Sequence, residues 1–227
     1  MRLLLFDIDG TLLTSSGAAG PAILRALSDL VGRPVGLNGI SFSGKTDPLI
    51  LREILQANEV PEEQIEALLP HALQAYATLA SSAITADTVR ALPGAQALLE
   101  ALAPQHNTQL ALLTGNIKRT AYLKLDAVGL GGYFAFGAFG SDDGDRNALP
   151  PVARRRAETV LNEPVAFQDT VIIGDTPRDI SCGRAHGCRT VAVATGSFDV
   201  DALAAHTPDI VLPDLEDMDA ALAALLD

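Results

Sequence analysis

Six short and nearly continuous apolar runs recur along the chain, and they constrain its fold more than any other feature. A strand with one face in water alternates apolar and polar residues, whereas a strand covered on both faces is apolar throughout. The runs therefore predict buried strands of a parallel sheet at Arg2–Phe6, Gln109–Leu113, Phe134–Phe139, Thr170–Ile173, Thr190–Ala194 and Asp209–Leu212.

Helical patterns separate most of these runs. They lie at Gly94–Ala103, Ile117–Val128, Pro151–Leu161, Arg178–His186 and Leu215–Leu226. Strands that alternate with helices are typical of a doubly wound α/β fold, in which ligands bind beyond the carboxyl ends of the strands. Hydrophobic residues make up 48% of the chain and charged residues 19%, a balance that suits a packed core rather than disorder.

Residues 15–86 interrupt the alternation. Helical periodicity fills this region without a convincing strand, and it predicts helices at Ala18–Leu30, Pro48–Asn58 and Glu62–Ser82. The stretches 34–39 and 43–48, rich in turn-forming residues, are expected to be loops. We therefore expect an α/β core domain made of residues 1–14 and 87–227, with an all-helical cap domain, residues 15–86, inserted after the first strand.

Charge and hydropathy exclude several classes of partner. A net charge of −12 repels nucleic acids and anionic membranes, both of which select basic patches. No apolar run reaches the ~20 residues of a membrane-spanning helix, and Asp7 and Asp9 interrupt the apolar start too early for a signal peptide. We expect a cytoplasmic monomer or weak dimer that binds a small molecule and attracts any phosphate by a local cation.

Polar motifs directly follow three of the predicted strands. They are Asp7-Ile8-Asp9-Gly10-Thr11 after the first, Thr114-Gly115-Asn116 after the second and Asp175-Thr176-Pro177-Arg178-Asp179 after the fourth. Each alone is consistent with an ordinary turn or helix cap, although the hydroxyl and backbone N–H groups of the second could also hold a phosphate. Because the ends of parallel strands share one edge of a sheet, the three motifs together predict one site.

Carboxylates dominate this predicted site. Four of them would repel one another there without a cation, namely those of Asp7, Asp9, Asp175 and Asp179. Oxygen ligands without a cluster of His or Cys favour a hard ion, and Mg²⁺ is the expected one. Cys182, His186 and Cys188 offer too few ligands for a structural zinc site, so we interpret the two cysteines as packing thiols.

Through these motifs the chain resembles the haloacid dehalogenase-like (HAD) hydrolases. The resemblance rests on D-x-D-G-T after the first strand, Thr114 after the second and G-D-x-x-x-D after the fourth, and it extends over essentially the whole chain. It is greatest toward phosphoglycolate phosphatase-like proteins with a helical cap of the C1 type. It implies a Rossmann-like core and a Mg²⁺-dependent phosphatase that hydrolyses a small phosphorylated metabolite through an aspartyl-phosphate.

The resemblance also implies roles for the matched residues. Asp7 would be the nucleophile, and Asp9 would be the general acid for the leaving alcohol and then the base for water. The metal would be held by Asp7, Asp175 and the backbone carbonyl of Asp9, with Asp179 supporting or joining its ligands. The segment Thr114-Gly115-Asn116 would hold the phosphoryl oxygens.

One residue that the family usually has is missing here. HAD phosphatases place a lysine between the third and fourth strands, but the lysines of this chain, Lys45, Lys118 and Lys124, lie elsewhere. Arg146, just before the helix that follows, is the best positional match. The alternative is that Arg146 pairs on the surface with its acidic neighbours, and the run Arg154–Arg156 is expected on a helix surface.

The cap loop and the choice of reaction complete these expectations. The loop residues Gly44, Lys45 and Thr46 are expected to contact substrate, and Lys45 either meets a second anionic group or stays in solvent.

Asp9 disfavours a dehalogenase or a phosphonate-cleaving enzyme, because neither reaction needs an acid at this position. A phosphomutase uses the same acid and base and stays open. The complete set of carboxylates disfavours a binding protein without catalysis.

Overall fold

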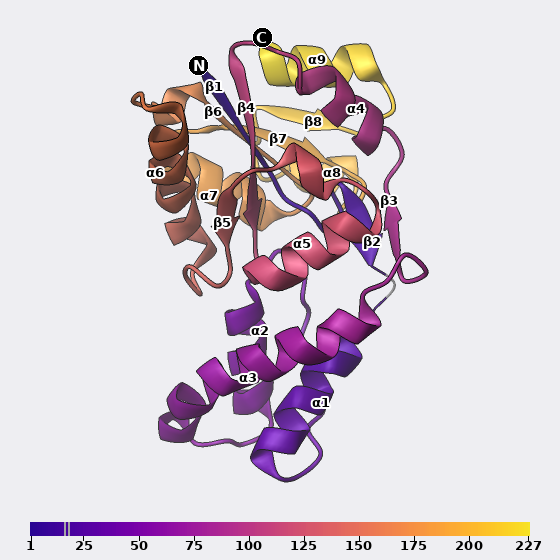
Figure 1. Ribbon diagram of the computed structural model, residues 1–227, viewed down its shortest axis with the longest axis vertical. Coiled ribbons are helices and arrows are strands. Elements are labelled where there is room, and N and C mark those ends of the chain that lie inside the picture. Colours follow the sequence, from indigo (N-terminus) through magenta and orange to yellow (C-terminus); the bar gives the residue numbers. More distant parts are fainter. Residues whose placement is uncertain (16, 18) are drawn as a thin grey trace.

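Parallel strands form a six-stranded central sheet, which Figure 1 shows in the upper part of the molecule. The computed structural model describes residues 1–15, 17 and 19–227. In the order β5-β4-β1-β6-β7-β8, the strands are Gly137–Phe139, Thr108–Thr114, Arg2–Phe6, Thr170–Gly174, Arg189–Val193 and Ile210–Leu212. The central strand β1 pairs with β4 and β6, so that Leu5 lies opposite both Ala111 and Ile172. The predicted doubly wound α/β fold is confirmed.

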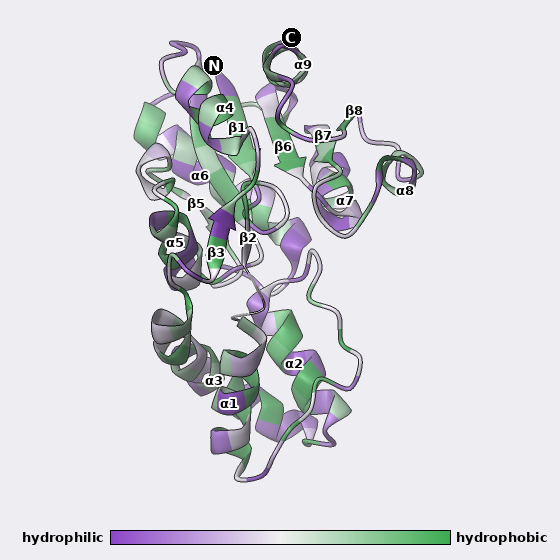
Figure 2. Cartoon of the chain, turned by 90° about the vertical axis from the view of Figure 1, so that its right-hand side faces the viewer, coloured by the Kyte–Doolittle hydropathy of each residue, from purple (hydrophilic) through white to green (hydrophobic). Residues whose placement is uncertain are grey.

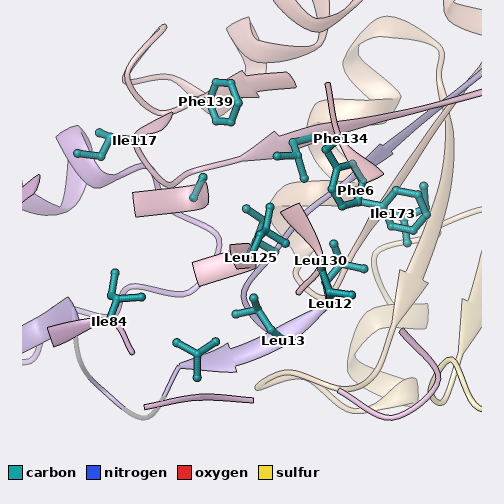
Figure 3. Packing of buried hydrophobic residues seen from close by; sticks show 14 of the residues in the cluster. Phe6, Leu12, Leu13, Ile84, Ile117, Leu125, Leu130, Phe134, Phe139 and Ile173 are labelled. Carbon is teal, nitrogen blue, oxygen red and sulfur yellow. The ribbon is translucent and has the colours of Figure 1, made fainter. Parts of the chain in front are cut away.

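Helices cover both faces of the sheet, which is why its strands are apolar throughout. Leu3 and Leu5 of β1 face one layer, formed by α6 (Leu149–Leu161) and α7 (Pro177–His186). Leu4 and Phe6 face the other, formed by α4 (Ala95–Leu102), α5 (Lys118–Ala127) and α9 (Met218–Leu226). Figure 3 shows part of this second layer, where the rings of Phe6 and Phe134 pack edge to face, with centroids 6.0 Å apart.

Three helices between β1 and α4 extend the molecule at one end (Figure 1). They are α1 (Ala19–Val31), α2 (Asp47–Ala57) and α3 (Glu62–Ala83), and they bury apolar side chains such as Ile23, Ile54 and Tyr76. In Figure 2 the hydrophobic residues of these helices are coloured green and the hydrophilic ones purple. The three predicted helices are present, although Ala18, the predicted start of the first, lies outside the described residues.

A two-stranded antiparallel ribbon joins these helices to the sheet domain. It consists of β2 (Leu13–Ser15) and β3 (Val89–Ala91). The sequence did not predict it, because three residues are too few to show an alternating pattern. The short helix α8 (Val200–Ala204) near β8 was also missed, because its five residues are too few to show helical periodicity.

The predicted strand Phe134–Phe139 is wrong in its first half. Gly131–Tyr133 forms a 3₁₀ turn, and regular pairing with β4 begins only at Gly137. Phe134 and Phe136 are nevertheless buried on opposite faces of the sheet. Their apolar character reflects this burial rather than membership of the strand ladder.

The two cysteines pack in the core, as expected. Cys182 and Cys188 are buried in the layer between the sheet, α6 and α7. His186 instead stacks on Phe167, with ring centroids 5.1 Å apart. Among the described helices, none is both long and apolar enough to cross a membrane.

Candidate active site

The three polar motifs meet at the carboxyl edge of the sheet. Asp7 directly follows β1, Thr114 ends β4 and Asp175 directly follows β6, and these strands are neighbours. All three side chains line one cavity of about 840 Å³. The opposite wall comes from the helical insert and includes Leu24, Leu37, Ile40, Phe42 and Ser43. A charged wall on the sheet thus faces a mostly apolar wall on the insert.

Three buried carboxylates form a cluster at the charged wall. One oxygen each of Asp7, Asp175 and Asp179 lies within 4.8 Å of the others. Burial raises the pKa of Asp7 to about 6 despite the adjacent guanidinium of Arg146. Burial and the charges of Asp179 and Asp7 raise the pKa of Asp175 to about 8. Full ionisation of these carboxylates therefore needs more positive charge than the protein groups around them supply.

Two glycines let the backbone approach Asp175 closely. Gly10 has φ +83°, and a Cβ there would lie 2.3 Å from Oδ2 of Asp175. A Cβ at Gly196 would lie 1.7 Å from the same oxygen. The hydroxyl of Thr195 donates to the carbonyl of Gly10 at 2.6 Å and ties these two loops together. The backbone at Gly10 thus packs against the Asp175 carboxylate.

Arg146 lies buried behind the carboxylates. It begins a 3₁₀ turn, Arg146–Ala148, after β5. One of its terminal nitrogens lies 3.3 Å from Oδ2 of Asp7 and also pairs with Asp179. Its guanidinium further donates to the carbonyl of Leu113 at 3.3 Å and to that of Gly44 at 3.4 Å. The alternative of a surface pair with its acidic neighbours does not describe this residue, which is 5% exposed.

The arginines of the following helix lie farther out. Arg154 pairs with Glu158 at 2.7 Å and stacks on Phe167. Arg156 donates to Asp142, and Arg155 is exposed. The expected surface position of this run matches what the structure describes.

Asp179 is held on both oxygens by the protein itself. Oδ1 accepts from Arg146, while Oδ2 accepts from the backbone N–H of Thr176 at 3.0 Å and from its hydroxyl at 2.6 Å. Asp7 and Asp175 line the cavity in front of it. A divalent cation with oxygen ligands fits the cavity-lining carboxylates of Asp7 and Asp175, with Asp179 as a supporting group.

Asp9 points away from this cluster toward a residue that the sequence did not suggest. Its Oδ2 accepts from Nζ of Lys124 at 2.6 Å and from Nδ2 of Asn116 at 2.7 Å, and its Oδ1 accepts from Ser15 at 2.9 Å. Burial would raise the pKa of Asp9, but the charge of Lys124 and these hydrogen bonds outweigh it and lower the pKa. Lys124 belongs to α5 and is 3% exposed.

A signal for Lys124 was present in the sequence. The spacing of Ala121 and Leu125 defines the buried face of the predicted helix, and Lys124 falls on that face beside Thr120. A lysine on an apolar helix face needs a buried partner. That reasoning would have singled it out.

The segment Thr114-Gly115-Asn116 connects β4 to this network. The hydroxyl of Thr114 accepts from the Asn116 backbone N–H at 3.3 Å and from its side chain at 2.9 Å. Gly115 contacts the insert so closely that a Cβ would lie 2.0 Å from the carbonyl oxygen of Lys45. All three residues line the cavity.

The loop 43–47 of the insert lies against the sheet domain. Thr46 donates from its hydroxyl to the carbonyl of Gly144 at 2.6 Å. Gly44, with φ +66°, lies next to the Thr176 side chain. Lys45 lines the cavity but pairs with Glu53 of α2. Gly44, Lys45 and Thr46 are therefore all near the charged wall, and the amino group of Lys45 already has an anionic partner.

Sequence comparisons identify relatives of this chain. The family description "haloacid dehalogenase-like hydrolase" matches residues 1–187. Phosphoglycolate phosphatase 1 of Pseudomonas aeruginosa is 27% identical over 223 residues, which cover 96% of this chain and 78% of that protein. A phosphoglycolate phosphatase of Aquifex aeolicus is 26% identical over 218 residues, covering 93% of this chain and 92% of that protein.

Solved structures share the fold. A hydrolase from Pseudomonas syringae aligns over 100% of both chains with a TM-score of 0.70 and 24% identity. A β-phosphoglucomutase from Clostridium difficile aligns over 99% of this chain and 97% of its own, with a TM-score of 0.72 and 19% identity. At these identities the likeness supports the fold.

Proposed function

The chain belongs to the haloacid dehalogenase-like hydrolases and is an enzyme of their phosphatase type; from this premise we propose that it is a Mg²⁺-dependent phosphatase that hydrolyses a small phosphorylated metabolite by way of a phosphoryl group bonded to Asp7. The observation that most supports this proposal is the cavity wall itself. There the carboxylates of Asp7 and Asp175 lie beside the guanidinium of Arg146, which is 3.3 Å from Asp7. A nucleophile, a metal ligand and a fixed cation are thus adjacent.

In the first half-reaction, a carboxylate oxygen of Asp7 attacks the phosphorus. The bond between the phosphorus and the ester oxygen breaks, and Asp9 donates a proton to the departing oxygen, which leaves as an alcohol. The phosphoryl group is then bonded to Asp7, and Asp9 is an ionised carboxylate.

In the second half-reaction, a water molecule gives a proton to Asp9 while its oxygen attacks the phosphorus. The bond to Asp7 breaks, inorganic phosphate leaves and the Asp7 carboxylate is regenerated. Asp9 has then regained the proton that it gave to the alcohol, and the cycle closes.

Positive charge is needed because a carboxylate and a phosphate repel each other. Mg²⁺ held by Asp7, Asp175 and the backbone carbonyl of Asp9 would offset this repulsion when bound. Arg146 supplies a second positive charge, since its position between Asp7 and Asp179 suits the role that a lysine has in the family. The hydroxyl of Thr114 and the backbone N–H groups that follow it would hold the phosphoryl oxygens.

Substrate choice would come from the helical insert. We assign residues 15–86 to a cap domain above a core of residues 1–14 and 87–227, and the loop Gly44-Lys45-Thr46 to the contact with the leaving group. The lining of the cavity by both parts of the chain supports this division. The net charge of −12 favours a small metabolite over nucleic acid or an anionic membrane as the partner, and a cytoplasmic location accords with that chemistry.

The test is a screen of small phosphate esters, phosphoglycolate among them, for release of inorganic phosphate. It is run with Mg²⁺ and with EDTA, and Asp7→Asn is the control for contaminating phosphatases. Phosphate release that needs both Mg²⁺ and Asp7 supports the proposal. No release from any ester under these conditions would contradict it, and turnover that needs a sugar bisphosphate would identify a phosphomutase instead.

A further inference from the structure

Lys124 is the cation closest to Asp9 in the described structure. Its Nζ lies 2.6 Å from Oδ2 of Asp9 and 2.7 Å from Oδ1 of Asn116. The lysine side chain is 4% exposed, whereas that of Asp9 is 37% exposed and faces the cavity. The pair therefore has a buried basic end and an open acidic end.

The position of Lys124 on its helix makes a purely structural origin of this pair costly. Thr120, Ala121 and Leu125 share its buried face on α5. A buried ammonium loses its hydration and needs well-placed acceptors, and an apolar side chain of similar volume would often be as stable or more stable there. A buried ammonium group at this position therefore points to a functional role of Lys124 at the cavity.

The two carboxylate oxygens of Asp9 have different hydrogen-bond donors. Oδ2 receives hydrogen bonds from Lys124 and from Asn116, and Asn116 is itself bound to Lys124 and Thr114. Oδ1 receives one hydrogen bond, from the Ser15 hydroxyl at 2.9 Å, and a hydroxyl can rotate away. Two donors thus fix the carboxylate through Oδ2 and leave Oδ1 as the oxygen that can exchange a proton.

We propose that Lys124 is a positioning residue for Asp9, which it holds by Oδ2 so that Oδ1 meets the ester oxygen of the substrate. This inference rests on the proposed phosphatase function. Lys124 acts through Asp9 and does not touch the phosphoryl group, a role distinct from that of Arg146, which contacts Asp7. In the proposed reaction, Oδ1 carries the proton that goes to the departing oxygen, and later takes one from water.

The dependence of rate on the leaving group tests this proposal. An alkyl alcohol is a poor leaving group and needs a proton as the ester bond breaks, whereas p-nitrophenolate leaves without one. The ratio kcat/KM covers the steps up to the loss of the alcohol. For Lys124→Met we expect kcat/KM to fall about 10–100-fold for alkyl phosphates, a part of what a general acid contributes, and only a few-fold for p-nitrophenyl phosphate.

Two further variants exclude a general loss of structure. Lys124→Arg keeps a cation that can bind a carboxylate, and should recover most of the activity toward alkyl phosphates. Lys118→Met removes an exposed lysine of the same helix and should leave both substrates unaffected. Thermal unfolding of each variant is measured in parallel, and Lys124→Gln, which keeps a hydrogen-bonding group, is used if Lys124→Met does not fold.

Several outcomes would overturn the inference. Equal losses on alkyl and p-nitrophenyl phosphates would make Lys124 a structural residue. A rise in KM confined to esters whose alcohol carries a carboxylate would make it a binding site for the substrate. A wild-type enzyme that hydrolyses no ester would reject the phosphatase function itself, whereas an active wild type with an unaffected Lys124→Met would reject the positioning role alone.

Discussion

Asp47 of the helical insert accepts a hydrogen bond from the backbone N–H of Ile117, at 2.8 Å, and so caps α5 of the sheet domain. A carboxylate at a helix N-terminus is favoured by the unpaired N–H groups and the helix dipole. The backbone N–H of Asp47 in turn donates to the carbonyl of Gly115 at 2.7 Å. The start of α2 is therefore docked on the start of α5, next to the cavity.

The burial of the Asp47 carboxyl makes stability depend on pH. Burial raises the pKa of Asp47 to about 6, despite the opposing charge of Lys124. The folded-state pKa exceeds the ordinary value of 3.8, so the folded protein favours the protonated carboxyl. The contribution of Asp47 to stability is therefore complete below pH 3.8 and is lost as the pH rises through 6. For a pKa difference of this size the loss is up to about 3 kcal/mol.

We therefore expect Asp47→Asn, whose amide has no charge, to gain stability relative to wild type between pH 4 and pH 7. The measurement is the unfolding temperature of both proteins across this range, without substrate. Asp29→Asn, which changes an exposed carboxylate of α1, is the control and should follow wild type. Parallel curves for Asp47→Asn and wild type would show that the carboxyl is not titrating in this range.

Hydrolysis should require Mg²⁺. We expect EDTA to stop turnover and Mg²⁺ to restore it, whereas Ca²⁺ should support little activity because its larger and looser coordination misplaces the nucleophile. Mg²⁺ should also raise the unfolding temperature of wild type, since it binds the folded state, and should do so less in Asp175→Asn. Full activity of the metal-free enzyme would remove the metal from the mechanism.

Asp7→Asn should abolish turnover and leave the fold intact, because the amide keeps the shape of the side chain and loses the negative charge of the attacking oxygen. Asp9→Asn should lose about 10²–10⁴ in rate, the usual contribution of general acid–base catalysis. Steady-state kinetics and circular dichroism check both variants. Substantial activity of the position 7 variant would mean that the nucleophile lies elsewhere.

Arg146→Ala should lower kcat about 10²–10³-fold, the typical effect of removing one preorganised electrostatic group. The same change leaves Asp179 without its cation, and breaking a buried pair typically destabilises a protein by about 3–5 kcal/mol. Kinetics are therefore measured below the unfolding temperature, with Arg146→Lys as the conservative variant. Arg154→Ala, on the same stretch of chain but paired with Glu158, should stay near wild type; the assignment fails if Arg154→Ala is the more damaging change.

The charged wall was predictable because strand ends are predictable. Asp7, Thr114 and Asp175 each follow an apolar run, and the rule that parallel strands end at one edge brings them together without further information. Arg146 was reached from its place after the third strand, although nothing in the sequence indicated which carboxylates it would contact. Its pairing with Asp179 depends on tertiary packing.

Side-chain contacts that depend on tertiary packing were not predicted from the sequence. The sequence placed Lys124 only outside the interval where the family has a lysine, and the docking of α5 is what shows that it meets Asp9. For Lys45 both substrate contact and solvent exposure were considered, and the structure pairs it with Glu53 of α2, the helix that follows directly. Local periodicity predicts which face a side chain occupies, but not which charge it will find there.

The ribbon of β2 and β3 fixes the two ends of the helical insert side by side, since Leu13 pairs with Ala91 and Ser15 with Val89. The chain leaves the sheet domain after Ser15 and returns to it at Val89, the residue with which Ser15 is paired. The entropy of closing such a loop grows only slowly with its length. Evolution or protein engineering could therefore exchange the insert as a module, giving enzymes that share one chemistry and recognise unrelated molecules.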